Sequence, residues 1–552
     1  ACLGTVGRLC MFRSFTLLLL FGWCACSDLS SVYCKPSTGD APFTCHIEQQ
    51  ATVVGASSWG RLYDEINQTG WSRLYVSSNA TISDDEQAFA AGYLEGAVSH
   101  VRTAQAWRNF KAYSASVSQT PSEAVKTWVE ENNRWVRAQA EARSNNYWEM
   151  ARLVLLQLDG LLEGHNENAA DEDKMSAMDL MLWQLQSDLS DIALIVDPSV
   201  RPDYDHMDFA AIRRRLQKRE HCSALIKVAE DLSDIYASHN TWTSYSTMVR
   251  VFRNIDMPLR AAKAHKIQMS GYPGFLASGD DFYQTSEKLV VMETTNEVFN
   301  SSLFHNIGPE GVVPYWLRVM VSNFIASSGE EWTTSFAQYN SGTYNNQWQV
   351  VDYKKLVPKE SLLPGALWIL EQIPTMMVAK DMTSTLQMGM WPSFNRPFYP
   401  EVYEAAGTAS MHEKHGIYFS YSNNYRMRIF RREQGSVHSI DDMKRLMRYN
   451  QWQTDPIADG DAELQIAARY DLVKSVPEWM EVASAGGCSD AKITSSSGVE
   501  SMTVHTISGP TADDQPVFTW GDQGGRWERV PHEGQPAVWD FPWIVVSGSD
   551  ST

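Results

Sequence analysis

Apolar residues recur at helical spacing through the first third of the chain, from about residue 83 to residue 195. Ser83 is followed three residues later by Glu86, which is the pattern of a capping box at the start of a helix. After Pro121 the helical spacing resumes, and residues 150–162 and 180–195 form two more apolar segments. The first helix is indicated by apolar positions three or four residues apart, namely Leu94, Ala97, Val101, Ala104 and Trp107.

The pattern changes after residue 222, where short apolar runs alternate with turns rich in Gly, Pro and Ser. Such runs predict strands, here at residues 223–228, 289–293, 349–353 and 367–370. Helical spacing is expected again at 245–253 and 443–449. A helix-rich part followed by mixed strands predicts an α+β protein.

A basic stretch separates these two parts of the chain. Residues 198–221 include Arg213, Arg214, Arg215, Lys218 and Arg219. A run of this kind is typical of a solvated helix face. It is equally typical of an exposed linker that is open to proteolytic trimming, and the two interpretations are compatible.

Charge restricts the partners that the protein can have. The chain of 552 residues carries 66 acidic and 46 basic side chains, a formal net charge of -20. Because like charges repel, a nucleic acid partner and simple electrostatic docking on anionic membranes are not expected. Many carboxylates would protonate at low pH and weaken this repulsion, which is compatible with an acidic compartment.

The N-terminal residues have the features of a signal peptide. Met11 and Arg13 precede the apolar run 16–21, and the small residues 24–27 suit a signal-peptidase site after Cys26. Residues 1–26 are therefore expected to be removed, with an N-terminal anchor as the alternative. The apolar run is too short to span a bilayer as a helix, and no later stretch is expected to be transmembrane.

Four cysteines lie beyond that segment. Cys34 and Cys45 could close a small loop in an oxidising compartment, which leaves Cys222 and Cys488. Behind a signal peptide, three Asn-x-Ser/Thr sequences are expected glycosylation sites, at Asn67, Asn79 and Asn300.

Cys222 heads an apolar strand, and two interpretations are open. It can be a small buried core residue. Alternatively, if the bond between His221 and Cys222 breaks, Cys222 becomes N-terminal and carries a thiol beside a free α-amine. The α-amine titrates near about 7.7–8.0 and the thiol near about 8.5, so the amine can act as the base for its own thiol.

Several stretches favour the second interpretation, because together they resemble the phospholipase B-like family of lysosomal N-terminal-nucleophile (Ntn) hydrolases. The most specific is residues 340–348, Asn-Ser-Gly-Thr-Tyr-Asn-Asn-Gln-Trp. The others follow in the family's order, at residues 271–275, 280–283, 293–296, 371–374, 430–432 and 445–450.

The resemblance implies a fold and a division of the chain. The fold would be an αββα four-layer sandwich, in which the helix-rich N-terminal portion folds together with the core. Residues 27–197 would form the N-terminal fragment, 198–221 the linker and 222–552 the core that begins at the nucleophile. The fragments would stay associated after cleavage, and the oligomeric state is left open.

The resemblance also implies a set of site residues. Cys222, His239 and Asn395 would be catalytic, with Asn395 binding an oxyanion. Trp242, Thr295 and Arg426 would contact the substrate, although Arg428 competes with Arg426 for that position. Each of these residues also has a purely structural interpretation.

The sequence lacks the motifs of the other hydrolase classes considered. The chain contains no G-x-S-x-G elbow, and His412 and His415 lack the spacing of a zinc-protease helix. No metal and no organic cofactor is expected. The sequence thus predicts a lysosomal or secreted hydrolase that removes acyl chains from glycerophospholipids through a Cys222 thioester. An amidase acting on linear amides and a non-enzymatic binding protein are the alternatives.

Overall fold

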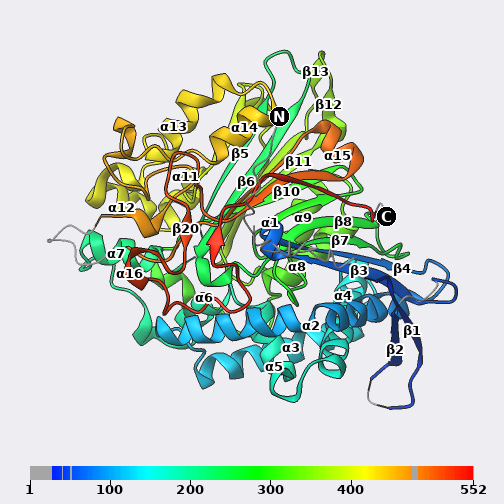
Figure 1. Ribbon diagram of the computed structural model, residues 1–552. Coiled ribbons are helices and arrows are strands. Elements are labelled where there is room, and N and C mark those ends of the chain that lie inside the picture. Colours follow the sequence, from blue (N-terminus) through cyan, green and yellow to red (C-terminus); the bar gives the residue numbers. More distant parts are fainter. Residues whose placement is uncertain (1–27, 40, 50–52, 220, 475–482, 551–552) are drawn as a thin grey trace, which may run out of the picture.

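Two β-sheets and the helices packed on them make up the protein (Figure 1). The structure is a computed structural model that describes residues 28–39, 41–49, 53–219, 221–474 and 483–550. The expected signal peptide, residues 1–26, lies outside these ranges. The mixture of helices and strands confirms the α+β class.

The larger sheet has eleven strands in the order β15-β14-β11-β10-β9-β8-β7-β4-β3-β1-β2. Its pairs are antiparallel except β4 with β7, which run parallel. Its strands are β1 (Ser30–Pro36), β2 (Phe43–Gln49), β3 (Ser58–Glu65), β4 (Trp71–Ser78), β7 (Val251–Asp256), β8 (Lys266–Gly271), β9 (Phe282–Thr285), β10 (Leu289–Thr295), β11 (Asn346–Asp352), β14 (Leu367–Ile373) and β15 (Met376–Asp381).

The smaller sheet has seven strands. Six follow the order β16-β5-β6-β18-β19-β22, and β17 pairs with β6 beside them. They are β5 (His221–Val228), β6 (Ile235–Ser244), β16 (Met390–Ser393), β17 (Gly486–Cys488), β18 (Asp490–Thr494), β19 (Thr503–Ser508) and β22 (Ile544–Ser547). Two short antiparallel pairs complete the described strands, β12 (Leu356–Val357) with β13 (Ser361–Leu362) and β20 (Phe518–Thr519) with β21 (Val538–Trp539).

The helices fall into an N-terminal and a C-terminal group. The first comprises α1 (Ile66–Thr69), α2 (Asp84–Ser116), α3 (Glu123–Ala142), α4 (Asn146–Asn168), α5 (Ala177–Gln184), α6 (Leu189–Val196) and α7 (Phe209–Leu216). The second comprises α8 (Tyr315–Ile325), α9 (Gly329–Phe336), α10 (Thr383–Leu386), α11 (Pro400–Ala405), α12 (Thr408–His415), α13 (Tyr425–Glu433), α14 (Ile440–Met447), α15 (Ser496–Ser501) and α16 (Asp522–Gly525).

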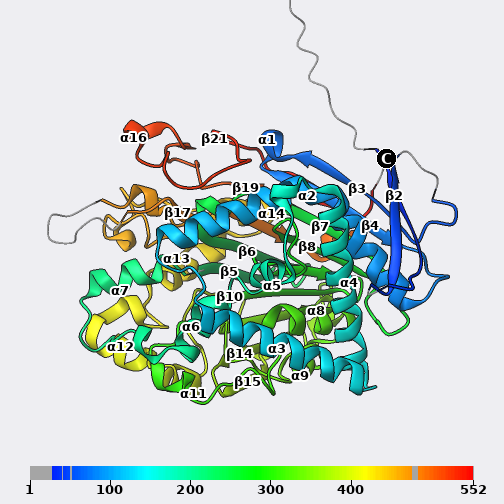
Figure 2. The ribbon, with the colours of Figure 1, turned by 90° about the horizontal axis from the view of Figure 1, so that it is seen from below.

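Three hydrophobic clusters hold these elements together. One joins α2, α3, α4, α8 and α9 to a face of the larger sheet, and in Figure 2 these helices lie across the strands. The second lies between the sheets, where Ile226 and Ala237 of the smaller sheet pack with Val290 and Met292 of the larger one. The third packs α13 and α14 against the outer face of the smaller sheet through residues such as Leu225. The site described below takes its residues from strands of both sheets and from α13.

The four strands predicted after residue 222 are β5, β10, β11 and β14, with bounds shifted by up to three residues. The helix at 443–449 is found as α14, whereas the helix expected at 245–253 is wrong. Only a short 3₁₀ turn forms there, and the chain continues as β7, which pairs with β4 and β8. The apolar segment 180–195 is divided into α5 and α6.

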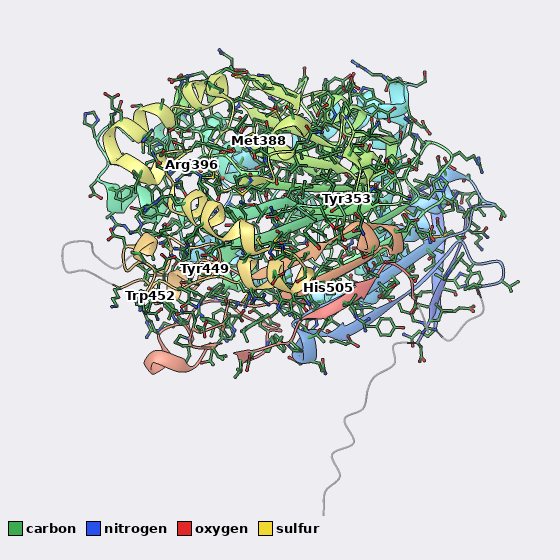
Figure 3. The ribbon with its side chains drawn as sticks, turned by 90° about the horizontal axis from the view of Figure 1, so that it is seen from above. Tyr353, Met388, Arg396, Tyr449, Trp452 and His505 are labelled. Atoms are coloured by element: carbon green, nitrogen blue, oxygen red, sulfur yellow. A yellow bond between two sulfur atoms is a disulfide. The ribbon has the colours of Figure 1, made fainter. Side chains whose placement is uncertain are left out.

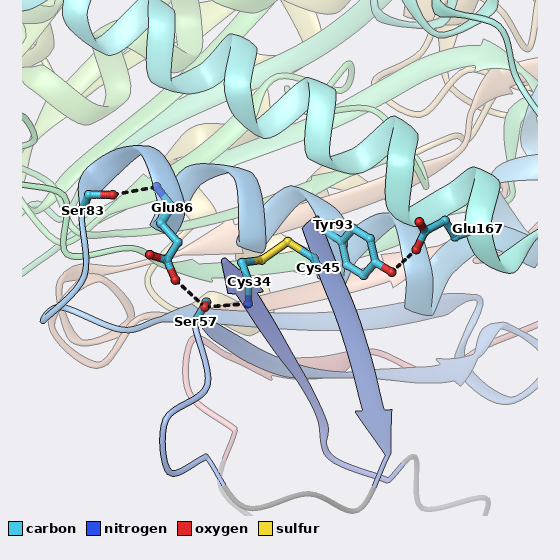
Figure 4. The surroundings of a disulfide bond; sticks show 7 residues. All are labelled: Cys34, Cys45, Ser57, Ser83, Glu86, Tyr93 and Glu167. Carbon is cyan, nitrogen blue, oxygen red and sulfur yellow. Dashed lines mark hydrogen bonds between the residues drawn. A yellow bond between two sulfur atoms is a disulfide. The ribbon is translucent and has the colours of Figure 1, made fainter. Parts of the chain in front are cut away.

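The long N-terminal helix begins where its cap was predicted. The Ser83 side chain accepts a hydrogen bond from the backbone N–H of Glu86. The Glu86 carboxylate binds Ser57 Oγ at 2.7 Å, which joins the helix to the chain before β3 (Figure 4). The predicted pairing of Cys34 with Cys45 is confirmed as a disulfide between β1 and β2 beside this contact.

No helix within the described ranges is both long enough and apolar enough to cross a membrane.

Candidate active site

Cys222 lies near the start of β5, the strand that runs between β16 and β6. Its side chain is 1 % exposed, so the thiol is covered in the continuous chain. The sulfur donates a hydrogen bond to Glu293 Oε1 at 3.5 Å, and the backbone N–H donates to Asn395 Oδ1 at 3.2 Å. The residue is buried, as the core interpretation required, but its neighbours are polar.

Asn395 follows β16 with a positive φ of 64°, a backbone conformation that asparagine tolerates better than most residues. Its Nδ2 donates to the backbone oxygen of Thr295 at 2.8 Å. Its Oδ1 is thereby directed at the backbone N–H of Cys222. This amide is oriented from both sides, as a group that must bind a reacting atom should be.

Arg426 lies in the first turn of α13 and closes the other side of Cys222. One guanidinium nitrogen donates to the Cys222 carbonyl oxygen at 2.5 Å, and the other donates to Asn395 Oδ1 at 2.9 Å. The guanidinium stacks on the Trp242 ring, 4.3 Å from its centroid. Burial lowers the pKa of Arg426 to about 9. Arg428 is exposed, so of the two competing arginines Arg426 is the one that contacts Cys222.

His239 lies on β6, opposite Ala224 of β5. Its Nε2 is 2.9 Å from the backbone oxygen of Glu293. Since a carbonyl oxygen only accepts, this nitrogen carries the hydrogen. Burial lowers the pKa of His239 well below its usual value, so the imidazole is neutral. Its described hydrogen bond holds the strand that carries Glu293.

Glu293 was not assigned a role from the sequence, although it opens the stretch 293–296 that matches the family. It is fully buried on β10, and its Oε1 accepts a hydrogen bond from Tyr344 Oη at 3.1 Å. Tyr344 also belongs to a matching stretch, residues 340–348. The sequence signal for Glu293 was therefore its place in a stretch that matches the family. Only the folded chain brings this carboxylate to the thiol.

The sequence predicted no metal. Three potential ligands nevertheless converge here, because one ligand atom from each of Cys222, His239 and Glu293 lies within 4.8 Å of the others. A thiolate, an imidazole and a carboxylate are all zinc ligands. The same three atoms are equally the parts of a nucleophilic site.

A cavity of about 340 Å³ borders this cluster through Thr295, which contacts Asn395, and Tyr344, which contacts Glu293, while Cys222 itself is not among its lining residues. Thr295 and Tyr344 line it near Cys222, together with Thr243, Ser244 and Arg219. Apolar residues such as Phe110, Leu189 and Leu194 also line it, among a larger number of Ser, Thr, Gln and charged side chains. The cavity therefore has a mixed polar and apolar lining.

Arg213 and Arg219 differ from the expected exposed linker, because both are buried in ion pairs. Arg213 on α7 contacts Asp461 and Glu463, each at 2.6 Å. Arg219 contacts Asp191 at 2.5 Å and Glu297 at 3.2 Å. The chain that leads to Cys222 is thus anchored at two points, Arg213 and Arg219, while Lys218 between them is exposed.

His221 precedes Cys222 and pairs with Trp242 in the strand register. Its Nδ1 is 3.1 Å from the backbone oxygen of Arg219, and burial lowers its pKa to about 3. A second small cavity borders His221, Trp242 and Arg426, and also Arg396 beside the helices α11–α13 (Figure 3).

Two of the expected glycosylation sites already use their side-chain nitrogens. Asn79 Nδ2 donates to the backbone oxygen of Ala56, and Asn300 Nδ2 donates to that of Ala405. Asn67 is exposed on α1. All three stay predictions, with Asn67 the most accessible.

Comparison with known proteins shows the family of this chain. The sequence model of the Phospholipase B family matches residues 58–546, so the chain belongs to that family. Phospholipase B-like protein B of Dictyostelium discoideum is 35% identical over 521 residues, which is 93% of this chain and 89% of the relative. Phospholipase B-like 1 of Rattus norvegicus is 34% identical over 499 residues, 89% of this chain and 87% of the relative. The predicted family is confirmed.

Proposed function

We propose that the protein is a phospholipase B-like hydrolase whose nucleophile is Cys222, released by self-cleavage between His221 and Cys222. The observation that carries the proposal is the convergence on one cysteine of an oriented amide, a guanidinium and a carboxylate. A core cysteine needs none of these groups. A nucleophile needs a base and a donor that stabilises developing charge.

The fold proposed for this chemistry is the αββα sandwich of the Ntn hydrolases. The packing of helices, two sheets and further helices supports it. In that arrangement the nucleophile begins a strand of one inner sheet, and Cys222 has this position in β5.

After cleavage, the new α-amine of Cys222 would serve as the base for the thiol. The thiolate would attack the carbonyl carbon of an acyl ester, and the leaving alcohol would take the proton. Water would then hydrolyse the thioester and restore the thiol. Arg426 is a donor available to the oxyanion of each step, and Asn395 would contribute the second hydrogen of Nδ2, because the first is donated to Thr295.

The proposed substrate is a glycerophospholipid, in agreement with the family's name. The apolar residues in the cavity lining suit an acyl chain, and its polar residues suit the ester and the headgroup. The predominance of polar lining residues favours a second candidate, hydrolysis of a linear amide. We also propose a lysosomal or secreted location, which the disulfide between Cys34 and Cys45 supports because such bonds persist in oxidising compartments.

Intact-mass analysis tests the self-cleavage. The full chain, matured at acidic pH, is expected to give one fragment that ends at His221 or earlier and one that begins at Cys222. Hydrolase activity in a chain still joined across residues 221–222 would rule the mechanism out. Turnover of a phospholipid and of an N-acyl amide by the same wild-type and Cys222→Ala preparations decides between ester and amide.

A further inference from the structure

The first proposed step takes place before the amine base exists. In the uncut chain the nitrogen of Cys222 belongs to a peptide bond, and its hydrogen is donated to Asn395 Oδ1 at 3.2 Å. An amide nitrogen of this kind does not accept a proton from the thiol. Self-cleavage therefore requires a different base from later turnover, and this inference rests on the proposed function.

Glu293 is placed to be that base. Its Oε1 accepts the hydrogen bond that Cys222 Sγ donates, across 3.5 Å. Glu293 lies on β10 of the larger sheet and Cys222 on β5 of the smaller one, so the contact spans the space between the sheets. Both side chains are almost fully buried, and no bulk water is needed to carry the proton between them.

Tyr344 and Asp281 hold the carboxylate in this position. Tyr344 Oη is 3.1 Å from Glu293 Oε1 and 2.9 Å from Asp281 Oδ2. A hydroxyl has one hydrogen, so one of these contacts must take its hydrogen from an acid. Burial raises the pKa of Asp281 to about 7. At acidic pH, protonated Asp281 can thus donate to Tyr344, which donates to Glu293.

His239 is the competing base, and its contacts favour a different role. Its Nε2 donates to the backbone oxygen of Glu293 at 2.9 Å. Burial lowers the pKa of His239 well below its usual value, so its ring is a weak proton acceptor. His239 is accordingly a positioning residue, because it holds the strand that carries Glu293.

We propose that Glu293 is the catalytic base of self-cleavage. The thiol proton of Cys222 passes to Glu293 Oε1, and the sulfur forms a bond to the carbonyl carbon of His221. The bond from that carbon to the Cys222 nitrogen then breaks, and the nitrogen takes the proton from Glu293. Water finally hydrolyses the resulting thioester, which leaves a carboxylate on His221 and a thiol with a free α-amine on Cys222.

The test is the rate at which the full-length chain separates at 221–222, followed by intact mass at acidic pH. Glu293→Gln keeps the size of the side chain and an oxygen that accepts hydrogen bonds, but it accepts no proton. A general base contributes about 10²- to 10⁴-fold, so cleavage is expected to slow by about that factor. A purely structural Glu293 would leave the rate unchanged in this variant.

Matched variants complete the experiment. Glu371→Gln makes the same change at another fully buried carboxylate of the larger sheet, and cleavage at the wild-type rate is expected. Glu293→Asp keeps a carboxylate one methylene farther back and is expected to cleave at a rate between those of wild type and Glu293→Gln. Near-ultraviolet circular dichroism checks that each variant is folded.

The outcomes separate this inference from the proposed function. Cleavage at the wild-type rate in folded Glu293→Gln would overturn the inference alone. An uncut wild-type chain would overturn the proposed function and the inference with it. Loss of wild-type cleavage in EDTA would assign the three converging ligands to a metal ion and would also overturn the role of Glu293 as base.

Discussion

Cys222 and Cys488 lie on the two strands that pair with the same part of β6, and Trp242 faces both His221 and Cys488 in the register. Both thiols are buried, at 1 % and 0 % exposure. Cys488 Sγ contacts the backbone oxygen of Asp490 and the amide of Asn240, whereas Cys222 Sγ contacts a carboxylate. Burial is therefore the same, and the two thiols differ in the groups that surround them.

The charged groups near the two cysteines also differ. Burial raises the pKa of Cys488 to about 11, so its thiol stays protonated at physiological pH. Cys222 has the Arg426 guanidinium on its carbonyl oxygen and a carboxylate at its sulfur. Cationic and proton-accepting groups at a thiol are typical of reactive cysteines. Four experiments can break or sharpen this contrast.

The largest effect is expected from removing each sulfur in turn. Cys222→Ala should abolish cleavage at 221–222 and lower hydrolase activity on the order of 10³-fold or more, because a covalent nucleophile has no substitute. Cys488→Ala should cleave and turn over normally and lose about 1 kcal/mol of stability. Activity assays and thermal unfolding measure these outcomes. Full activity in folded Cys222→Ala would show that Cys222, like Cys488, is not needed for catalysis.

The next effect concerns the guanidinium at Cys222. Arg426→Gln should lower kcat/KM about 10²-fold, the usual cost of losing one donor to a developing oxyanion. Arg428→Gln, two residues along the same helix and exposed, should stay within about twofold of wild type. The activity of Arg426→Lys and the melting temperature of each variant distinguish a loss of catalysis from a loss of folding. Equal losses in the Arg426 and Arg428 variants would contradict the assigned position of the charge.

A smaller and graded effect is expected from pH. In Cys222→Ala the only remaining unbridged thiol within the described residues is Cys488. Because burial raises its pKa to about 11, the thiolate fraction should rise close to tenfold per pH unit from pH 7 to pH 10. Iodoacetamide labelling followed by mass spectrometry measures this slope. Rapid labelling that is independent of pH would show that Cys488 is also activated.

The smallest effect on function is expected at the third kind of cysteine, the bridged pair. The Cys34–Cys45 disulfide spans 11 positions, and loop-closure entropy gives a loop of that size about 2–3 kcal/mol. The double variant Cys34→Ser, Cys45→Ser should therefore unfold more easily, while turnover stays within about twofold. Urea unfolding and activity of the same samples test both. A large loss of turnover would mean that the hairpin supports the site.

Local patterns predicted much of the fold, and non-local pairing explains the errors. The strand before Glu293 and the helix at Ser83 could be predicted because apolar spacing and cap residues act over a few positions. Residues 245–253 were expected to be helical, but β7 forms there because β4, far earlier in the chain, supplies parallel hydrogen bonds. Arg219 was expected to be exposed, and its carboxylate partners are 28 and about 78 positions away.

The site was also predicted only in part. Cys222, Asn395 and Arg426 were chosen from the family resemblance, and the structure brings them into contact. Glu293 was missed as a functional residue because its partner thiol is 71 positions away. A carboxylate in a buried strand has no local signature that distinguishes a base from a structural acceptor.

By itself, the sequence determined the family, the α+β class, the helical first third and the cysteine at the head of a strand. These features follow from motifs and from spacing along the chain. Only the tertiary structure decided which carboxylate meets the Cys222 sulfur, which arginine lies on its carbonyl and which cysteine stays in the core. The physical reason is that hydrogen bonds act over about 3 Å, and the packing of two sheets brings groups to that distance from opposite parts of the chain.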